Sequence, residues 1–273
     1  MTEFKVKLQS LHTDLQEVTF WKGVAIIMVI FTHSHQMFDI SQEIRWIPMF
    51  CQMGCQLFFS LSCFLSCLSF DRNRSGYFTY LKRRLKSISI GYWLAILMSV
   101  SLAAISIIAT DKNIFNTSTN PIDILENIFF IHGIDPIGGA NNNVVKGGWF
   151  IGTLVILYVL FPFFYNLYTK TKYGSYLPIV LFVICFCLLS YINLQNTEYV
   201  VHRNSFLYFS FVNQLPSFLV GFYIYEWYKR GKPKDKLSIV KGGLLLVASF
   251  CFFKNATPTA NIIYPFLFSI ADR

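Results

Sequence analysis

The sequence has 273 residues, of which 54% are hydrophobic and only 14% are charged, whereas an average soluble domain has about 25% charged residues. The formal net charge of +9 would suit a nucleic-acid-binding protein. The basic residues lie in short segments between apolar runs, however, and 29 Phe and 15 Tyr are spread over the whole length, so we expect no nucleic-acid partner and predict an integral membrane protein.

Apolar runs of spanning length recur along the chain, since a bilayer core of about 30 Å needs roughly 20 apolar residues as helix. Residues 1–19 are polar and mixed and do not resemble a cleavable signal. Residues 121–133 are too short and too acidic to cross, and they predict an interfacial or re-entrant helix. The predicted spans are 20–38, 46–70, 88–109, 149–168, 176–194, 206–228 and 239–255, followed by an incomplete run at 262–271.

The sequence therefore predicts an all-α fold, a polytopic transmembrane helical bundle of about eight spans that is incomplete at its C-terminus. Basic residues give its orientation. With the N-terminus placed in the cytoplasm, 18 of the 23 Lys and Arg residues fall on the cytoplasmic side, as the positive-inside rule expects. The other five are Arg45, Lys112, Lys146, Arg203 and Lys254. We expect a multi-pass protein of the cell membrane whose lipid bilayer is its first partner.

The first predicted span contains two ionisable residues on one face. Lys22 and His33 are 11 positions apart, which is about three turns plus 20°, or about 16 Å along a helix axis. An ionisable residue inside a span indicates a functional site by default. Two alternatives stay open: His33 could hydrogen-bond a neighbouring helix, as Thr32 could, and Lys22 could extend to the membrane surface.

A second basic feature precedes the third predicted span. Residues 71–87 contain six basic residues and one acid, and the densest part, Lys82–Lys86, lies directly at the start of that span. Arg and Lys side chains suit phosphate groups as a planar fork and a point charge. Attraction to anionic lipids explains the same pattern, so the spacing alone leaves both interpretations open.

The seven cysteines do not predict a metal site. Most lie inside apolar segments, where a free Cys behaves as a small hydrophobic residue. Cys51, Cys55, Cys63 and Cys67 recur along one predicted span, and residues spaced along one helix cannot surround a tetrahedral zinc ion. We therefore expect no metal and no bound cofactor.

Several segments, in order, resemble the membrane-bound acyltransferase-3 family, which acylates surface polysaccharides and other glycans. The first span, GVAIIMVIFTH with Lys22 and His33, is similar to the family's first span. Further similar segments are GCQLFFSLSCFLSCLSF (54–70), YLKRRLKSISIGYW (80–93), WFIGTLVILYVLFPFFY (149–165) and LPSFLVGFYIYEW (215–227). The resemblance covers residues from about 15 to 228.

The resemblance implies a single integral-membrane acyltransferase-like domain over residues 1–273, in a bacterial inner or plasma membrane. The implied activity is O-acyl transfer, with acetyl transfer as the main expectation, from cytoplasmic acyl-CoA to a hydroxyl of a surface glycan or lipid-linked saccharide. Lys22, Arg83 and Arg84 would hold the phosphates of the donor. His33 would be the general base, a role that suits imidazole because its charge changes near neutral pH.

Two other site residues follow from the same resemblance, and one role stays open. Trp149 and Tyr158 would lie on the acceptor side. His33 could act as a covalent acyl carrier instead of a base.

The sequence also departs from the family pattern. Lys22 stands where Arg is frequent, and Lys keeps the charge but loses the fork. Cys63, Ser87, Ile90 and Leu154 stand where the family commonly has Gly, Arg, Pro and an acid. The family tends to about ten spans, so the chain reads as a truncated member. A flippase or transporter of a glycan or lipid precursor and an inactive truncated remnant are the alternative functions.

Overall fold

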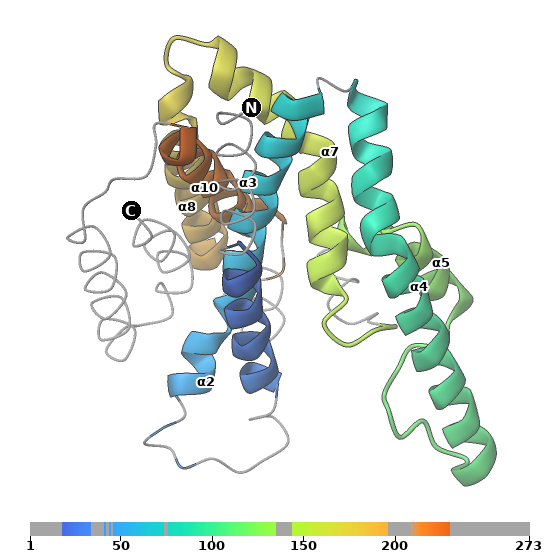
Figure 1. The fold of residues 1–273 in the computed structure, drawn as a ribbon. Coiled ribbons are helices and arrows are strands. Elements are labelled where there is room, and N and C mark those ends of the chain that lie inside the picture. The colour runs from blue at the N-terminus through green and yellow to red at the C-terminus, as the bar shows by residue number, and fades with distance from the viewer. Residues whose placement is uncertain are drawn as a thin grey trace. The chain divides into compact units, whose positions relative to one another are not determined.

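In the computed structural model, residues 18–33, 41, 44, 46–73, 76–134, 144–195, 209 and 211–229 are described (Figure 1). The regular elements in these ranges are all helical, which confirms the predicted all-α class. A first helix, Val18–His33, precedes the labelled ones. The others are α2 (Trp46–Cys51), α3 (Gly54–Asn73), α4 (Tyr77–Thr110), α5 (Pro121–Ile128), η1 (Ile131–Gly133), α7 (Trp149–Lys170), η2 (Gly174–Tyr176), α8 (Leu177–Gln195) and α10 (Phe211–Lys229).

Three helices of the described part are long and apolar enough to cross a bilayer: α3 over Gly54–Asp71, α4 and α7. The protein is an integral membrane protein. The count of about eight spans and the cytoplasmic N-terminus stay predictions. The predicted runs at 239–255 and 262–271 lie outside the described residues, as do residues 34–38 of the first predicted span.

Two predicted boundaries differ from the structure. The run at 46–70 divides into α2 and α3 at a turn over Gln52 and Met53. The helix that contains the third predicted span is longer than that span, because α4 starts at Tyr77, 11 residues before residue 88. Leu, Lys and Arg have high helix propensity, so the basic segment continues the helix instead of forming a loop.

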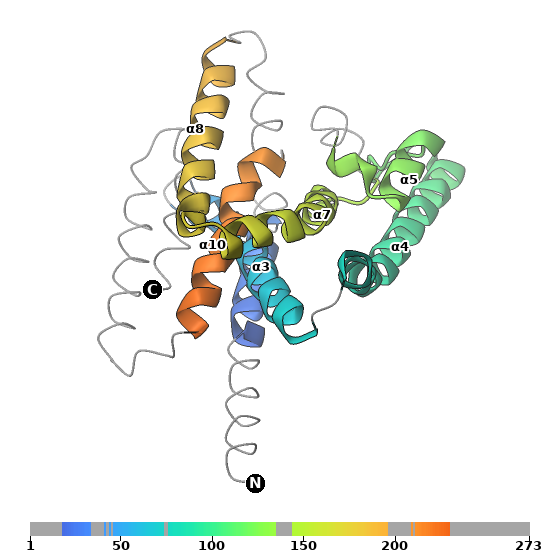
Figure 2. The same ribbon diagram turned by 90° about the horizontal axis from the view of Figure 1, so that it is seen from above.

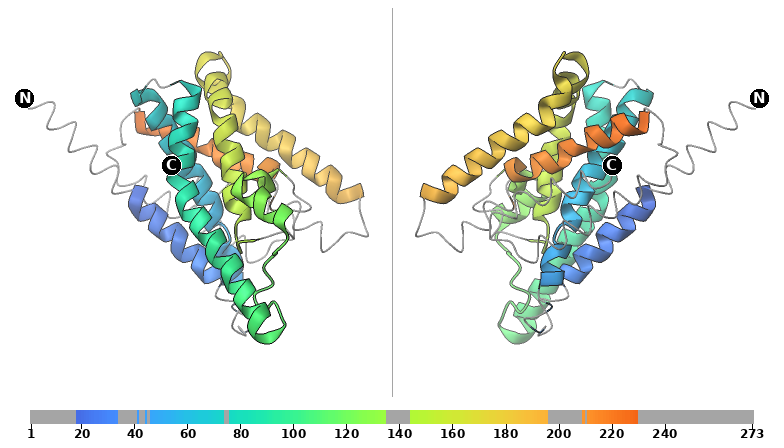
Figure 3. Two further views of the ribbon diagram at one scale, coloured as in Figure 1. Left: turned by 90° about the vertical axis from the view of Figure 1, so that its right-hand side faces the viewer. Right: turned by 90° about the vertical axis from the view of Figure 1, so that its left-hand side faces the viewer.

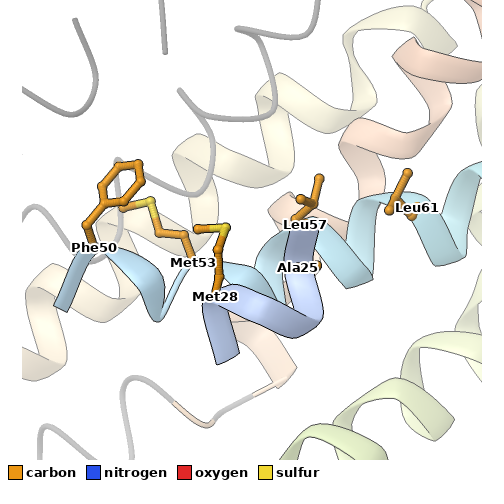
Figure 4. Close-up of a cluster of buried hydrophobic side chains, with 6 residues drawn as sticks. All are labelled: Ala25, Met28, Phe50, Met53, Leu57 and Leu61. Carbon is orange, nitrogen blue, oxygen red and sulfur yellow. The ribbon is translucent and has the colours of Figure 1, made fainter. Parts of the chain in front are cut away.

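The chain divides into two compact units, residues 1–65 with 217–273 and residues 66–216. The first unit packs the helix Val18–His33 against α2 and the start of α3. Its buried apolar cluster consists of Ala25, Met28, Phe50, Met53, Leu57 and Leu61 (Figure 4). A Cβ atom on Gly54 would lie 2.7 Å from the Ala25 carbonyl oxygen, so the two helices touch backbone to backbone, as membrane helices with small residues do.

The same unit joins α3 to α10 by a second close approach. A Cβ atom on Gly221 would lie 2.5 Å from the Ser60 carbonyl oxygen, and the Ser60 hydroxyl donates a 2.7 Å hydrogen bond to the Ser217 carbonyl. Phe64 and Tyr228 meet edge to face, with ring centroids 5.6 Å apart. Small residues and a backbone-directed hydroxyl therefore hold this pair together.

In the second unit, α4 and α7 run antiparallel, as Figures 2 and 3 show from two directions. Tyr92 on α4 lies level with the start of α7, whereas residues nearer the start of α4 contact the middle of α7. The short helix α5 and the turn η1 pack against both helices. At 34 residues, α4 is about 51 Å long, well beyond the roughly 30 Å of a bilayer core.

Candidate functional site

The side chain of Arg84 is half-buried between two aromatic rings of the second unit. Its guanidinium carbon lies 5.7 Å from the Tyr80 ring centroid and 5.5 Å from that of Tyr158. Both distances are within the range of a cation–π contact. α4 supplies Arg84 and Tyr80, which are four residues apart and so share a face, while α7 supplies Tyr158.

The Nη2 atom of Arg84 is buried and has no hydrogen-bond partner in the part of the chain that the structure describes. Arg84 also has no ion pair with any described residue. A buried charge normally has a hydrogen-bonded partner of opposite charge, because leaving it alone costs several kcal/mol. The site is therefore electrostatically incomplete and would accept an anion.

An aromatic shell fixes the position of these rings. Tyr80 is only 1% exposed, and its hydroxyl hydrogen-bonds the Ser66 hydroxyl at 3.1 Å. The Phe161 ring lies 5.2 Å from Tyr80, and Phe70 lies 5.9 Å from Phe161. Packed aromatic rings of this kind have few alternative positions, so the Arg84 guanidinium is held in one place.

Arg84 contacts α7 near the middle of that helix rather than at its end. Tyr158 is the tenth of the 22 residues of α7, about 14 Å from the start of that helix. The sequence predicted the basic segment at the start of the third span. In the structure, the guanidinium contacts the middle of a candidate span, a position where a charge is expensive and indicates function by default.

The neighbouring basic residues point elsewhere. Arg83, Lys82 and Lys86 are exposed, because consecutive positions on a helix are rotated by about 100°. The two adjacent arginines therefore differ in environment: the structure brings Arg84 together with Tyr158 and leaves Arg83 on the surface.

In the first unit, Lys22 and His33 lie on one continuous helix, Val18–His33, as predicted. Lys22 is half-buried, and His33 is exposed at the last residue of the helix. Thr32, beside His33, is buried, and its hydroxyl lies 3.1 Å from both the Met28 and the Pro48 carbonyl oxygens. Thr32 thus makes the hydrogen bond to a neighbouring helix that the sequence left open for it.

Trp149 is the first residue of α7 and is buried. Its ring centroid lies 4.8 Å from that of Phe209, and Thr153, one turn further along, donates a 3.2 Å hydrogen bond to the Phe209 carbonyl. Trp149 and Tyr158 share one helix but lie nine residues apart, so they line different depths of α7.

A second polar cluster, Tyr92–Asn127–His132, joins α4, α5 and η1. The Tyr92 hydroxyl donates a 2.7 Å hydrogen bond to Asn127 Oδ1 and lies 3.3 Å from His132 Nε2. His132 Nε2 is also 3.0 Å from the Gly148 carbonyl oxygen. The other ring nitrogen, Nδ1, lies 3.4 Å from the Glu126 carbonyl oxygen. Asn127 is fully buried and His132 is 3% exposed.

Close backbone packing surrounds this cluster. A Cβ atom on Gly133 would lie 2.3 Å from the Gly152 carbonyl carbon, and one on Gly148 would lie 2.4 Å from the Tyr92 hydroxyl oxygen. Phe130 has a left-handed backbone, with φ of 62°, which is strained for a large side chain. Its ring stacks on that of Tyr92, with ring centroids 5.6 Å apart. The side chains of the cluster are therefore held in fixed positions.

The sequence analysis did not identify Tyr80, Tyr92, Asn127 or His132 as site residues. A signal was present for Tyr80, which precedes Arg84 by four residues and therefore shares its face. No local pattern marks the other three, because their contacts join segments 35 to 40 residues apart in the sequence. Among the described residues, no group of His, Cys, Asp and Glu is arranged to hold a metal ion.

Comparison with known protein families gave one finding. A family profile described as an acyltransferase domain, that of acyltransferase 3, matches residues 15–270. The match covers both polar sites of the second unit and the first helix with Lys22 and His33. Searches of curated proteins and of solved structures found no match.

Proposed function

The chain belongs to the acyltransferase-3 family, and we propose that it transfers an acyl group from cytoplasmic acyl-CoA to a hydroxyl of a surface polysaccharide or lipid-linked saccharide. Acetyl-CoA is the donor we expect first. Family membership indicates acyl transfer in general; the donor and the acceptor are the proposal.

The observation that carries the proposal is the buried Arg84 Nη2 atom, which has no hydrogen-bond partner among the described residues. Coenzyme A carries several phosphate groups, and Arg is well suited to bind phosphate because its guanidinium donates two parallel hydrogen bonds. The rings of Tyr80 and Tyr158 hold the guanidinium in place, so little ordering is needed when the anion binds. Arg83 and Lys22 would add positive charge to the same donor.

We assign the chemical step to His33. The acceptor hydroxyl oxygen attacks the carbonyl carbon of the thioester while His33 takes the hydroxyl proton. The carbon–sulfur bond then breaks, and the leaving thiolate receives the proton, which yields an ester and free coenzyme A. Proton transfer of this kind typically contributes 10²–10⁴ in rate. Trp149 and Tyr158 would contact the acceptor from α7.

The first experiment measures acetyl-CoA binding to the purified full chain in lipid nanodiscs by calorimetry. Arg84→Ala should weaken binding about 10- to 100-fold, the effect of losing hydrogen bonds to a charged ligand. Arg83→Ala is the matched control, since it removes an equal charge at the next, exposed position, and it should weaken binding only a few-fold. Equal losses in the two variants would indicate general attraction between charges instead of a site at Arg84.

The second experiment separates binding from chemistry. His33→Ala should retain acetyl-CoA binding and lose acyl transfer, measured as release of free coenzyme A in the presence of membrane glycans. Acylated protein that accumulates with the native chain would favour the acyl-carrier role of His33. If the native chain neither binds acetyl-CoA nor releases coenzyme A, the proposal fails and a flippase or an inactive remnant becomes the better explanation. Mass spectrometry of surface glycans with and without the gene identifies the acceptor.

A further inference from the structure

The short helix α5 has its polar residues inside and its apolar residues outside. Asp123 and Asn127 are its buried residues, at 6% and 0% exposure, whereas Ile122 and Leu125 are 64% and 53% exposed. Phe129, directly after the helix, is 66% exposed. A surface helix of a water-soluble protein has the opposite arrangement.

The two buried polar residues of α5, Asp123 and Asn127, are hydrogen-bonded. Asn127 Nδ2 donates to the Asp123 carbonyl at 2.8 Å, and Asn127 Oδ1 accepts from the Tyr92 hydroxyl. The Asp123 carboxylate accepts from the Ser118 hydroxyl. Glu126 is the remaining acid of α5; it is half-buried, and its buried Oε2 atom has no hydrogen-bond partner among the described residues. The fully exposed residues of α5, Pro121, Ile122 and Leu125, carry no charge.

α5 and η1 also contact the middle of α4, far from the C-terminal end of that helix. The Trp93 indole N–H donates a 3.1 Å hydrogen bond to the Ile128 carbonyl, and the neighbouring Tyr92 contacts both Asn127 and His132. Tyr92 precedes the end of α4 at Thr110 by 18 residues, which is about 27 Å. The chain therefore folds back along a candidate span to its middle.

The outer face of α5 continues an apolar surface of α4. Leu94, Leu97 and Met98 of α4 are 56 to 64% exposed, in a helix long and apolar enough to cross a membrane. The connection at the far end of α4 differs, because Asp111 and Lys112 are both exposed there. The connection that follows α4 thus carries exposed charged residues, whereas the exposed residues of α5 are uncharged.

We propose that α5 and η1 are immersed in the membrane, with Ile122, Leu125 and Phe129 in contact with lipid acyl chains. An element placed in hydrocarbon satisfies its polar groups internally and turns apolar side chains outward. Asp123 and Asn127 of α5 are hydrogen-bonded inside the protein, and Ile122 and Leu125 are exposed. Continuity with the apolar surface of α4 favours lipid over a protein partner. This contact is independent of the acyl-transfer proposal.

The test uses the photoreactive amino acid benzoylphenylalanine, introduced singly into the otherwise native full chain in phosphatidylethanolamine–phosphatidylglycerol vesicles. The test positions are Leu125 and Phe129. Leu97 is the positive control on α4, and Lys112 is the negative control in the exposed connection. All four are surface positions, and the Phe129 substitution exchanges one aromatic ring for another, so at least this variant should fold.

After illumination, intact-protein mass spectrometry should show a gain of one phospholipid mass at Leu125, Phe129 and Leu97, and at least a five-fold smaller yield at Lys112. The proposal is overturned if Leu97 gives lipid adducts while Leu125 and Phe129 do not. It is equally overturned if these two positions give a doubled chain mass, which indicates a second copy, or an internal cross-link seen only in the peptide map.

Discussion

At Arg84, a buried nitrogen of a charged side chain has no hydrogen-bond partner among the described residues, whereas two turns further along α4 the Tyr92 hydroxyl has two polar neighbours. Both sites lie in the second unit, and both face α7. The Tyr92–Asn127–His132 cluster is also closely packed against the backbone at Gly148 and Gly152. Arg84 is flanked by ring faces instead of hydrogen-bond acceptors.

The comparison separates a structural polar site from one that is prepared for a ligand. A buried network whose polar groups are hydrogen-bonded to one another stabilises the fold. Removing one member leaves polar groups of the others without hydrogen-bond partners, which is unfavourable. A buried charge without a partner does the reverse: it costs stability until an anion binds. Substitutions in the Tyr92–Asn127–His132 cluster should therefore mainly lower the free energy of unfolding. Substitutions at Arg84 should mainly weaken binding of the anion.

The largest effect should come from the packing around the Tyr92–Asn127–His132 cluster. Gly133→Ala would put a methyl group 2.3 Å from the backbone of Gly152, and backbone atoms of a packed helix cannot move aside. We expect a loss of about 3 kcal/mol in the free energy of unfolding, the upper part of the range for overpacking. The measurement is denaturant unfolding in detergent micelles.

Gly91→Ala is the matched control for Gly133→Ala. No atom lies within 4 Å of a Cβ at Gly91, and alanine is favoured over glycine inside a helix by about 0.5–1 kcal/mol. The control variant should be as stable as the native chain or slightly more stable. If both alanine variants unfold at the native midpoint, the backbone contact between η1 and α7 is not made.

A smaller effect is expected when the network loses one hydroxyl. Tyr92→Phe keeps the ring that stacks on Phe130 and removes the donor to Asn127 Oδ1. Because Asn127 is fully buried, its oxygen is left unpaired, which costs about 1–2 kcal/mol. Tyr176→Phe, at an exposed tyrosine, should stay within about 0.5 kcal/mol of the native chain. Equal stability of the two variants would argue against the network.

Much of the helical organisation could be predicted from the sequence, because hydrophobic runs and span length are local properties. The ends of α7 agree with those of the predicted span 149–168 to within two residues. The ends of α8 agree with those of the predicted span 176–194 to within one residue. The segment at 121–133 contains the short helix α5, as predicted, while its interfacial or re-entrant place stays a prediction. The helix α4 begins 11 residues before the predicted span, because a hydropathy pattern ends where Lys and Arg begin, whereas helix propensity does not.

The sites were harder to predict, because they depend on which helix faces which. Arg84 was named from its charge and from a family resemblance, but its burial against Tyr158 comes from the register between α4 and α7. His132 was passed over, since a single histidine beside a glycine-rich segment carries no motif. Its role follows only from contacts with residues 40 positions before and 16 positions after it.

The smallest change in stability should occur at Arg84, and it should have the opposite sign to the losses at the network. Arg84→Met fills similar volume without a charge, and replacing a buried charge by an apolar side chain is often neutral or stabilising. We expect the free energy of unfolding without ligand to rise by up to about 1 kcal/mol, while acetyl-CoA binding weakens about 10- to 100-fold. Arg83→Met, at the exposed neighbour, should change neither quantity by as much. A loss of stability at Arg84→Met comparable to that of Tyr92→Phe would mean that Arg84 is a structural residue, and the contrast between the two sites would disappear.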